Sequence, residues 1–229
     1  MGVDGKLISA VRNGLSQLAD ADRALAMRAY MKSEMPFRGV PSPARAGLTK
    51  AVFADHPLPD RVTFTETVLA LWRDAEYREE RYAAIALSGY RAYRRWQDPG
   101  LLPMYEELIV TGAWWDYVDE LAIRRVGPIL RAHRAEVTPL LLAWATDADR
   151  WRRRTAVICQ IGAKHEVDRK LLTAAVEATA EDPDFFLRKG IGWALRDHAR
   201  LAPDWVRAFV RDHPALSPLS TREALKHLG

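Results

Sequence analysis

Cysteine is nearly absent from this sequence. One cysteine occurs in 229 residues, which excludes a disulfide framework and favours a reducing, cytoplasmic compartment. Cys159 follows the apolar residues Ala156, Val157 and Ile158, so we expect it to be a small core residue and not a nucleophile.

Recognisable metal and phosphate motifs are also missing. The six histidines are scattered, and no spacing combines them with carboxylates or Cys159 as a metal site requires. A glycine-rich phosphate loop, a nucleophile elbow and a zinc-deaminase signature do not occur. We therefore expect neither a metal nor another cofactor.

Long hydrophobic runs are missing as well. No stretch reaches the apolar length needed to cross a bilayer, and the N-terminus has no secretion signal pattern. We expect a soluble, cytoplasmic protein with no membrane association. With 48% hydrophobic residues and no low-complexity tract, the chain can bury a sizeable core, and we treat residues 1–229 as a single domain.

Strand-like alternation is almost absent, whereas almost every segment has a helical period. Proline and glycine punctuate these segments. The sequence therefore predicts an all-α protein, and its short connections predict antiparallel neighbouring helices. The expected helices span residues 4–18, 21–34, 43–54, 62–74, 76–97, 101–111, 114–132, 136–146, 149–163, 167–180, 184–200, 203–212 and 217–228.

A weak internal repeat organises these helices. Basic residues precede a small-apolar step near positions 81–85, 153–157 and 188–191. Ala84 and Ala156 lie 156 − 84 = 72 positions apart, two periods of about 36, which is the spacing of helix-pair solenoids. We expect stacked helical hairpins whose inner helices line one concave surface, large enough for a nucleic-acid duplex or a peptide.

The charge balance is mildly basic. The net charge is +4, the sequence pI is about 9.3, and arginine outnumbers lysine, which favours a phosphate-bearing partner. An arginine excess also arises from a GC-rich genome. The charge runs at residues 78–81 and 150–154 are expected to be solvated helix faces.

Tryptophan and aspartate occur together where the helix near residue 114 opens. Trp115 and Asp119 are four positions apart, so one helix face presents both. An indole face and a carboxylate suit a positively charged ligand or transition state. The alternative is a tryptophan packed in a helical core beside an aspartate at a helix start.

The helix at 184–200 places large side chains away from its core-facing stripe of Leu187, Ile191, Ala194 and Leu195. On the opposite face, Lys189 and Arg196 flank Trp193 and lie near Phe186. This combination fits a groove that follows a nucleic-acid backbone. A contact between neighbouring repeats is the alternative.

Arg154 is anomalous because it shares a helix face with Val157, Ile158 and Ile161. It can extend its charge to solvent from the first helical turn, pair internally with a carboxylate, or reach a phosphate at the concave surface. Arg150 lies one turn earlier on this face, so the two arginines are expected to form a basic cluster.

Several of these motifs together resemble the AlkD family of bacterial DNA alkylation repair enzymes. The similar segments are residues 28–32, 107–111, 114–119, 151–156, 185–196 and 218–227. The resemblance implies a superhelical solenoid of stacked HEAT-like antiparallel helix pairs with a concave basic groove. It also implies a base-excision-repair glycosylase for cationic alkylpurines such as 3-methyladenine and 7-methylguanine, acting without base flipping.

The resemblance also assigns roles to residues. Asp119 corresponds to the family's catalytic aspartate, Trp115 and Trp193 to its sugar-contacting tryptophans, and Arg154 to its active-site arginine. Tyr30 matches a tyrosine that lines the DNA groove. The first twenty residues match poorly, and no role is assigned to them.

The DNA-contacting cations come from the helix-face argument. We expect Arg150, Lys189 and Arg196 to contact phosphates of duplex DNA that contains alkylated purines. A monomer with no obligate protein partner is the default expectation. Two other functions stay open, a non-catalytic DNA-binding relative and a helical-repeat scaffold that binds an acidic protein or peptide.

Overall fold

The computed structural model describes residues 2–228, and within that range it contains helices and connecting turns but no strand. The prediction of an all-α protein is therefore confirmed. The described residues pack as two compact units, one ending at Trp96 and one beginning at Gln97. The single domain that the sequence predicts over 1–229 stays a prediction. Each unit is described by itself below.

The N-terminal unit is a group of helices around an apolar core that includes Leu7, Val11, Phe64 and Leu71. Its first helix begins where the Asp4 carboxylate accepts a hydrogen bond from the Leu7 amide, a standard helix N-cap. The helices are α1 (Gly5–Gln17), α2 (Ala21–Met31), α3 (Ser42–Asp55), α4 (Arg61–Arg73), α5 (Arg78–Ser88) and the 3-10 segment η1 (Arg91–Trp96).

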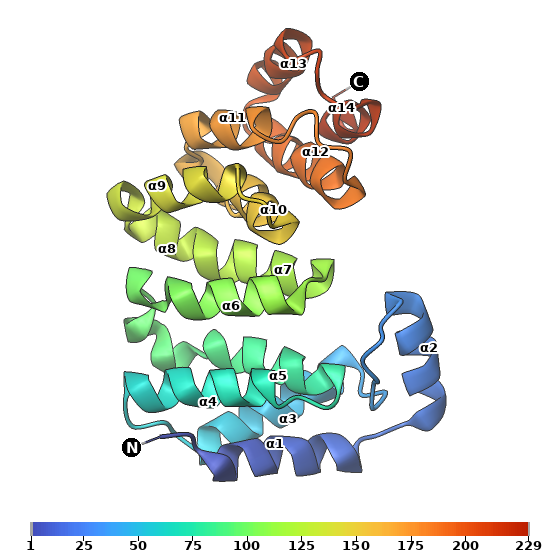
Figure 1. Cartoon of the computed structure of the whole chain (residues 1–229), viewed down its shortest axis with the longest axis vertical. Helices are drawn as coiled ribbons and strands as arrows, with labels where there is room; N and C mark the ends of the chain where they lie inside the picture. Colours follow the sequence, from blue (N-terminus) through green and yellow to red (C-terminus); the bar gives the residue numbers. More distant parts are fainter. Residues whose placement is uncertain (1, 229) are drawn as a thin grey trace. The chain divides into compact units, whose positions relative to one another are not determined.

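The C-terminal unit is a series of helical hairpins joined by short turns (Figure 1). A short 3-10 turn, η2 (Pro99–Leu101), leads into its first α-helix. The helices are α6 (Leu102–Gly112), α7 (Trp115–Leu121), the π-helical segment η3 (Ala122–Val126), α8 (Gly127–Ala132), α9 (Arg134–Ala145), α10 (Arg150–Ile158), the 3-10 turn η4 (Lys164–Glu166), α11 (Arg169–Glu177), α12 (Phe185–Ala199), α13 (Pro203–Asp212) and α14 (Pro218–Leu225).

Successive hairpins of this unit stack in register. In one layer α10 packs against α7 and α12, and α12 packs against α14; in the other, α9 packs against α11 (Figure 1). The side-chain bonds between hairpins join residues 35 apart in the pair Arg154–Asp119 and 34 apart in the pair Lys189–Glu223. These separations agree with the predicted repeat of about 36, because equivalent positions of neighbouring hairpins face one another.

Most predicted helices occur, but the long ones are interrupted. The helix expected at 76–97 ends at Ser88, before Gly89 and Tyr90, and the chain continues as a 3-10 segment. The helix expected at 114–132 contains the π-helical segment before Pro128, whose missing N–H and ring disturb a regular helix at this point. The helix expected at 149–163 ends at Ile158.

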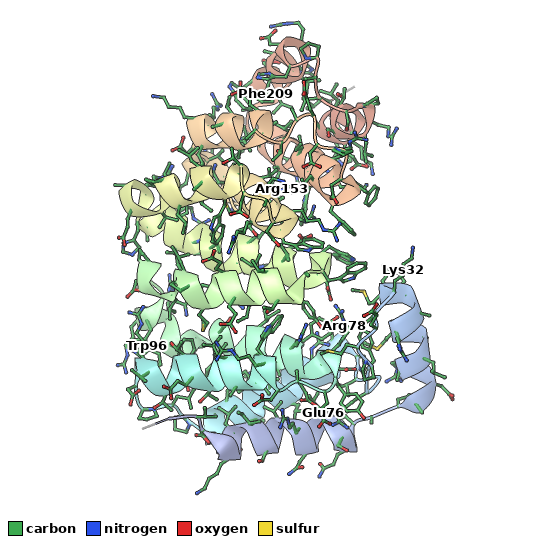
Figure 2. The ribbon with its side chains drawn as sticks, viewed as in Figure 1. Lys32, Glu76, Arg78, Trp96, Arg153 and Phe209 are labelled. Atoms are coloured by element: carbon green, nitrogen blue, oxygen red, sulfur yellow. The ribbon has the colours of Figure 1, made fainter. Side chains whose placement is uncertain are left out.

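The charge run at residues 78–81 is not the solvated helix face that the sequence predicts. Arg78, Glu79 and Glu80 are buried, with Arg78 labelled in Figure 2. The Glu79 carboxylate accepts hydrogen bonds from the backbone amides of residues 38–40, and Glu80 pairs with Arg12 over 3.0 Å. The prediction was wrong because these bonds replace the water that buried charges lose.

Cys159 lies in the core, as predicted, and burial raises the pKa of its thiol to about 12. Close packing surrounds it: a Cβ on Gly127 would lie 2.2 Å from the Cys159 carbonyl oxygen, so α8 approaches the end of α10 where only glycine fits. Across residues 2–228, no helix is both long enough and apolar enough to cross a membrane.

Candidate functional site

The site is built on α7, whose first residue is Trp115. One turn later on the same face lies Asp119, with a side chain only 14% exposed. Trp115 is half-buried, so it is neither a core residue nor a freely solvated one. The sequence prediction that one face presents both side chains therefore agrees with the helix that forms here.

Arg154 of α10 pairs with Asp119 through both carboxylate oxygens. The Arg154 Nε donates to Oδ1 over 2.7 Å, and Nη2 donates to Oδ2 over 2.8 Å. Its Nη1 donates to the backbone oxygen of Phe186 on α12. Of the three alternatives for Arg154, the internal pair with a carboxylate is the one observed, and two of the five guanidinium N–H groups remain for other partners.

Gly190 makes room for this guanidinium. A Cβ at Gly190 would lie 3.0 Å from Arg154 Nη1 and 3.2 Å from a methyl carbon of Ile158. A side chain on this turn of α12 would therefore press on the arginine that holds Asp119. No role for Gly190 could be predicted from the sequence, because a glycine inside a helical pattern does not indicate which neighbouring group needs the space.

Burial and the salt bridge act on Asp119 in opposite directions. Loss of hydration raises the pKa of Asp119 above its ordinary value of 3.8, and the hydrogen bonds and charge of Arg154 oppose this rise. The result is a carboxylate with an elevated pKa whose ionised form depends on Arg154. A group of this kind, partly buried and paired with one specific partner, is typical of functional sites.

The faces of α12 are those that the sequence predicts. Leu187, Ile191, Ala194 and Leu195 are buried, whereas Trp193 remains half-buried. Lys189 and Arg196, one turn on either side of Trp193, keep side-chain exposures of 42% and 23%. Trp193 is therefore accessible together with two cations.

Glu223 of α14 is a member of this site that the sequence analysis missed. Its Oε1 accepts a hydrogen bond from Lys189 Nζ over 2.9 Å, and its Oε2 pairs with Arg196 Nη1. These contacts lower the pKa of Glu223, with the hydrogen bond from Lys189 as the main cause. The missed signal was its position 34 residues after Lys189, about one repeat later.

Two cavities adjoin the tryptophans. The smaller, of about 270 Å³, is lined by Trp115, Arg154, Phe185, Phe186, Lys189, Trp193, Arg196 and Glu223. The larger, of about 600 Å³, is lined by Trp115, Asp116, Asp119, Glu120, Ile123, Arg124, Pro128, Arg131, Ile161, Gly162 and Trp193. Both cavities share Trp115 and Trp193, whereas Asp119 lines only the larger cavity and Lys189 and Arg196 line only the smaller one.

The arginine run at 150–154 is engaged with acids and is not the simply solvated face that the sequence predicts. Arg150 pairs with Asp184 over 3.1 Å, and Arg153, labelled in Figure 2, pairs with Asp182 over 3.0 Å. Arg152 bridges two further acids, Glu106 at 2.8 Å and Asp147 at 3.0 Å. Arg150 is still exposed, with 48% of its side chain accessible.

Tyr30 belongs to the N-terminal unit and is not among the residues gathered here. It lies near the end of α2, and it is 79% exposed. An exposed tyrosine of this kind is free to contact a partner, but its placement beside the other predicted site residues stays a prediction.

The groups at this site suit a ligand that carries a positive charge and, close to it, an anionic group. Asp119 offers a partly buried carboxylate, Trp115 and Trp193 offer π faces, and Lys189 and Arg196 can meet an anion nearby. Among residues 2–228, no cluster of three or more His, Cys, Asp or Glu side chains could hold a metal ion. The carboxylate of Asp119 and the indoles of Trp115 and Trp193 can each stabilise a positive charge.

Comparison with known proteins gives one family. The sequence model of a family described as DNA alkylation repair enzyme matches residues 11–228. A solved structure described as a predicted DNA alkylation repair enzyme from Enterococcus faecalis is 29% identical, with a TM-score of 0.82, over 92% of this chain and 97% of that one. No curated protein matches the sequence significantly.

Two more distant structures share the fold. The protein smu.31 from Streptococcus mutans UA159 is 17% identical, with a TM-score of 0.60, over 81% of this chain and 98% of that one. AlkD2 from Streptococcus mutans is 16% identical, with a TM-score of 0.61, over 78% of this chain and 87% of that one. At these identities the two structures support the helical-repeat architecture alone.

Proposed function

This chain belongs to the family of DNA alkylation repair enzymes, and we propose that it is a monofunctional DNA glycosylase. Its substrates would be cationic alkylpurines in duplex DNA, of the 3-methyladenine and 7-methylguanine type. The observation that carries the proposal is the carboxylate of Asp119, 14% exposed and held by Arg154, on the wall of a cavity lined also by Trp115 and Trp193.

The leaving group explains why so few catalytic groups suffice. A purine alkylated on a ring nitrogen already carries a positive charge, so it departs as a neutral base without a proton from the enzyme. The charge that remains develops on the deoxyribose as an oxocarbenium-like cation. The protein needs to stabilise that cation and to present water to the anomeric carbon.

Asp119 has the position and charge for this task. Two unit charges about 4 Å apart, at an effective dielectric constant near 20, interact by about 4 kcal/mol. If that interaction is realised only in the transition state, it accelerates the reaction about a thousandfold. Arg154 would keep Asp119 charged and oriented, and its two remaining N–H groups could meet the adjacent phosphate.

The two tryptophans would pack against the deoxyribose. Their π faces would add about 0.5–2 kcal/mol of interaction with the developing cation. Because the cavities around Trp115 and Trp193 are open to the surface of one unit, we propose that the lesion is excised without insertion into a deep pocket. Most base-modifying enzymes instead rotate the target nucleotide out of the duplex into an active-site pocket.

Binding would rest on the cations around the site. Arg150, Lys189 and Arg196 would contact DNA phosphates, and Tyr30 would contact the duplex from the N-terminal unit. We further propose that the protein acts in base excision repair as a cytoplasmic, nucleoid-associated monomer, over one domain comprising residues 1–229. Neither a metal, another cofactor nor an obligate protein partner has a role in this scheme.

The experiment is detection of free base and of an abasic site after incubation with a duplex that carries one 7-methylguanine. The proposal predicts release of the base in the presence of a metal chelator, with strand cleavage only after alkaline or enzymatic treatment of the abasic site. Tight binding of the duplex without base release would instead support a non-catalytic DNA-binding protein. Absence of both would favour a scaffold for an acidic protein.

A further inference from the structure

Glu223 is anchored from two sides beside Trp193. Its carboxylate accepts from Lys189 Nζ over 2.9 Å and pairs with Arg196, and its side chain is only 14% exposed. Lys189 precedes Trp193 by four positions and Arg196 follows it by three, so the three side chains share one face of α12. The carboxylate therefore fixes a cation on each side of the tryptophan.

Close packing of two helices brings Glu223 to this position. A Cβ added to Gly192 would lie 2.4 Å from the Cβ of Glu223 and 2.9 Å from the Ser220 backbone oxygen, so α14 crosses α12 at a glycine. The Ser220 hydroxyl donates to the Arg188 carbonyl oxygen over 3.0 Å. The packing of α14 against α12 thus includes contacts that do not involve the Glu223 carboxylate.

The charges of this group do not cancel. Lys189 and Arg196 carry two positive charges and Glu223 one negative charge, which leaves one net positive charge beside Trp193. A phosphate that approaches either cation also approaches Glu223 and is repelled by it. Two long, flexible cations would bind phosphate more strongly without Glu223, but they would not be held at fixed places.

We propose that Glu223 is a positioning residue of the DNA site, which holds Lys189 and Arg196 on either side of Trp193 and weakens non-specific attraction for phosphate. This inference rests on the proposed glycosylase function, because the groups it positions are those expected to hold the damaged strand. In effect, Glu223 lowers affinity for undamaged DNA and raises the excision rate of the bound lesion.

Two variants separate the effect of the negative charge of Glu223 from the effect of the length of its side chain. Glu223→Gln keeps the shape and removes the charge, whereas Glu223→Asp keeps the charge on a side chain too short to meet both cations. Asp204→Asn is the matched control, since it removes one negative charge from an aspartate of α13 whose side chain is 95% exposed. Thermal melts establish that each variant folds.

Each protein is measured in two assays. The first is binding to an undamaged duplex at a series of salt concentrations, and the second is single-turnover release of 7-methylguanine at saturating protein. For Glu223→Gln we expect affinity several-fold tighter than in the Asp204→Asn control. The salt slope should be steeper by up to about 0.9 for each additional phosphate that the variant neutralises, and excision should be several-fold slower. For Glu223→Asp we expect the wild-type salt slope with slower excision.

An excision rate equal to wild type in both Glu223 variants overturns the positioning role, and a salt slope in Glu223→Gln equal to that of Asp204→Asn overturns the electrostatic one. The two results together would leave Glu223 as a residue that only packs α14 against α12. If the wild-type protein releases no base, the proposed function fails, whereas the salt-slope comparison still decides whether Glu223 restrains the two cations.

Discussion

The pair formed by Asp119 and Arg154 combines stability and chemistry in one contact. Removing the arginine from a buried pair leaves a carboxylate without compensation, which typically costs about 3–5 kcal/mol. Asp119 keeps 14% of its side chain exposed, so water can soften this penalty. Burial raises the pKa of Asp119, and the contact with Arg154 opposes this rise and favours the ionised carboxylate.

Arg154→Ala is expected to shift the pH dependence of excision. Because Arg154 opposes the rise in the pKa of Asp119, its removal raises that pKa further. The proposed mechanism requires the ionised carboxylate, so the acid limb of the excision rate should move to higher pH than in the wild type. Single-turnover rates at saturating protein across a pH series measure this shift.

The stability of the Arg154→Ala variant should also depend on pH, because the raised pKa of Asp119 affects the free energy of unfolding. An aspartate with a raised pKa in the folded protein costs stability at pH values above that pKa, and the cost disappears as the pH falls through it. The destabilisation should therefore be largest near neutral pH and shrink in acid. Arg211→Ala, which removes an exposed pair with Asp212, is the control; equal behaviour of both variants would contradict the account.

The sequence predicted some of these residues well and others poorly. Helical spacing alone placed Trp115 beside Asp119, and an arginine in an apolar stripe marked Arg154 as a residue that needs a partner. The partner itself could not be chosen, because Asp119 lies 35 residues away. Glu223 was missed for the same reason, since a lone carboxylate on a short helix has no local signal.

At the scale of elements, the contact between α12 and α14 has little freedom. A side chain at Gly192 would overlap Glu223 and the backbone oxygen of Ser220. Backbone cannot move aside as a flexible side chain can, so the two helices would separate. Because α14 supplies Glu223, this packing also determines where Lys189 and Arg196 lie.

Gly192→Ala is therefore expected to destabilise the protein by about 1–3 kcal/mol, the usual cost of overpacking. The gain in helix propensity, about 1 kcal/mol in favour of alanine, offsets part of the clash. Urea denaturation monitored by circular dichroism measures the change in the free energy of unfolding.

Gly47→Ala is the matched control for Gly192→Ala. Gly47 also lies inside a helix, α3, but no atom lies within 4 Å of a Cβ added there. It should be neutral or stabilising by up to about 1 kcal/mol. If Gly192→Ala is as stable as Gly47→Ala, α14 does not pack against α12 as tightly as described.

Helix positions were the most predictable feature of the elements, since periodicity and proline breaks are local signals. The helix expected at 203–212 occurs as Pro203–Asp212. Interruptions were less predictable: the π-helical segment Ala122–Val126 lies within a continuous helical pattern. Pro128 follows this segment, but a proline by itself does not indicate whether a helix ends, kinks or becomes π-helical.

At the scale of the whole molecule, the charge is largely arranged in pairs. The chain has 34 Lys and Arg against 30 Asp and Glu, and the arginines at 150–154 pair with acids. A phosphate must therefore compete with a carboxylate at many of these cations. Affinity for DNA should depend strongly on salt. The slope of log affinity against log salt concentration should nevertheless be smaller than if every arginine neutralised a phosphate.

Tyr30→Ala tests whether the N-terminal unit takes part in DNA binding. Because Tyr30 is 79% exposed and lies outside the unit that carries Asp119, its loss should weaken binding several-fold. The excision rate at saturating protein should stay near that of the wild type. Fluorescence anisotropy and single-turnover kinetics measure the two effects, with Leu25→Ala, another exposed residue of α2, as the control.

An affinity for DNA equal to wild type in Tyr30→Ala would contradict the role that the family resemblance implies. A slower excision rate with unchanged affinity would instead place Tyr30 in the chemical step. Stability should change little in either variant, because both side chains are exposed.

The central claim is that the carboxylate of Asp119 drives excision of a cationic purine. The most direct test is single-turnover release of 7-methylguanine from a defined duplex, with a metal chelator present, by the wild type and by Asp119→Asn. We predict release by the wild type, and by the variant a rate about a thousandfold lower with DNA binding retained. Equal rates for the two proteins would contradict the claim.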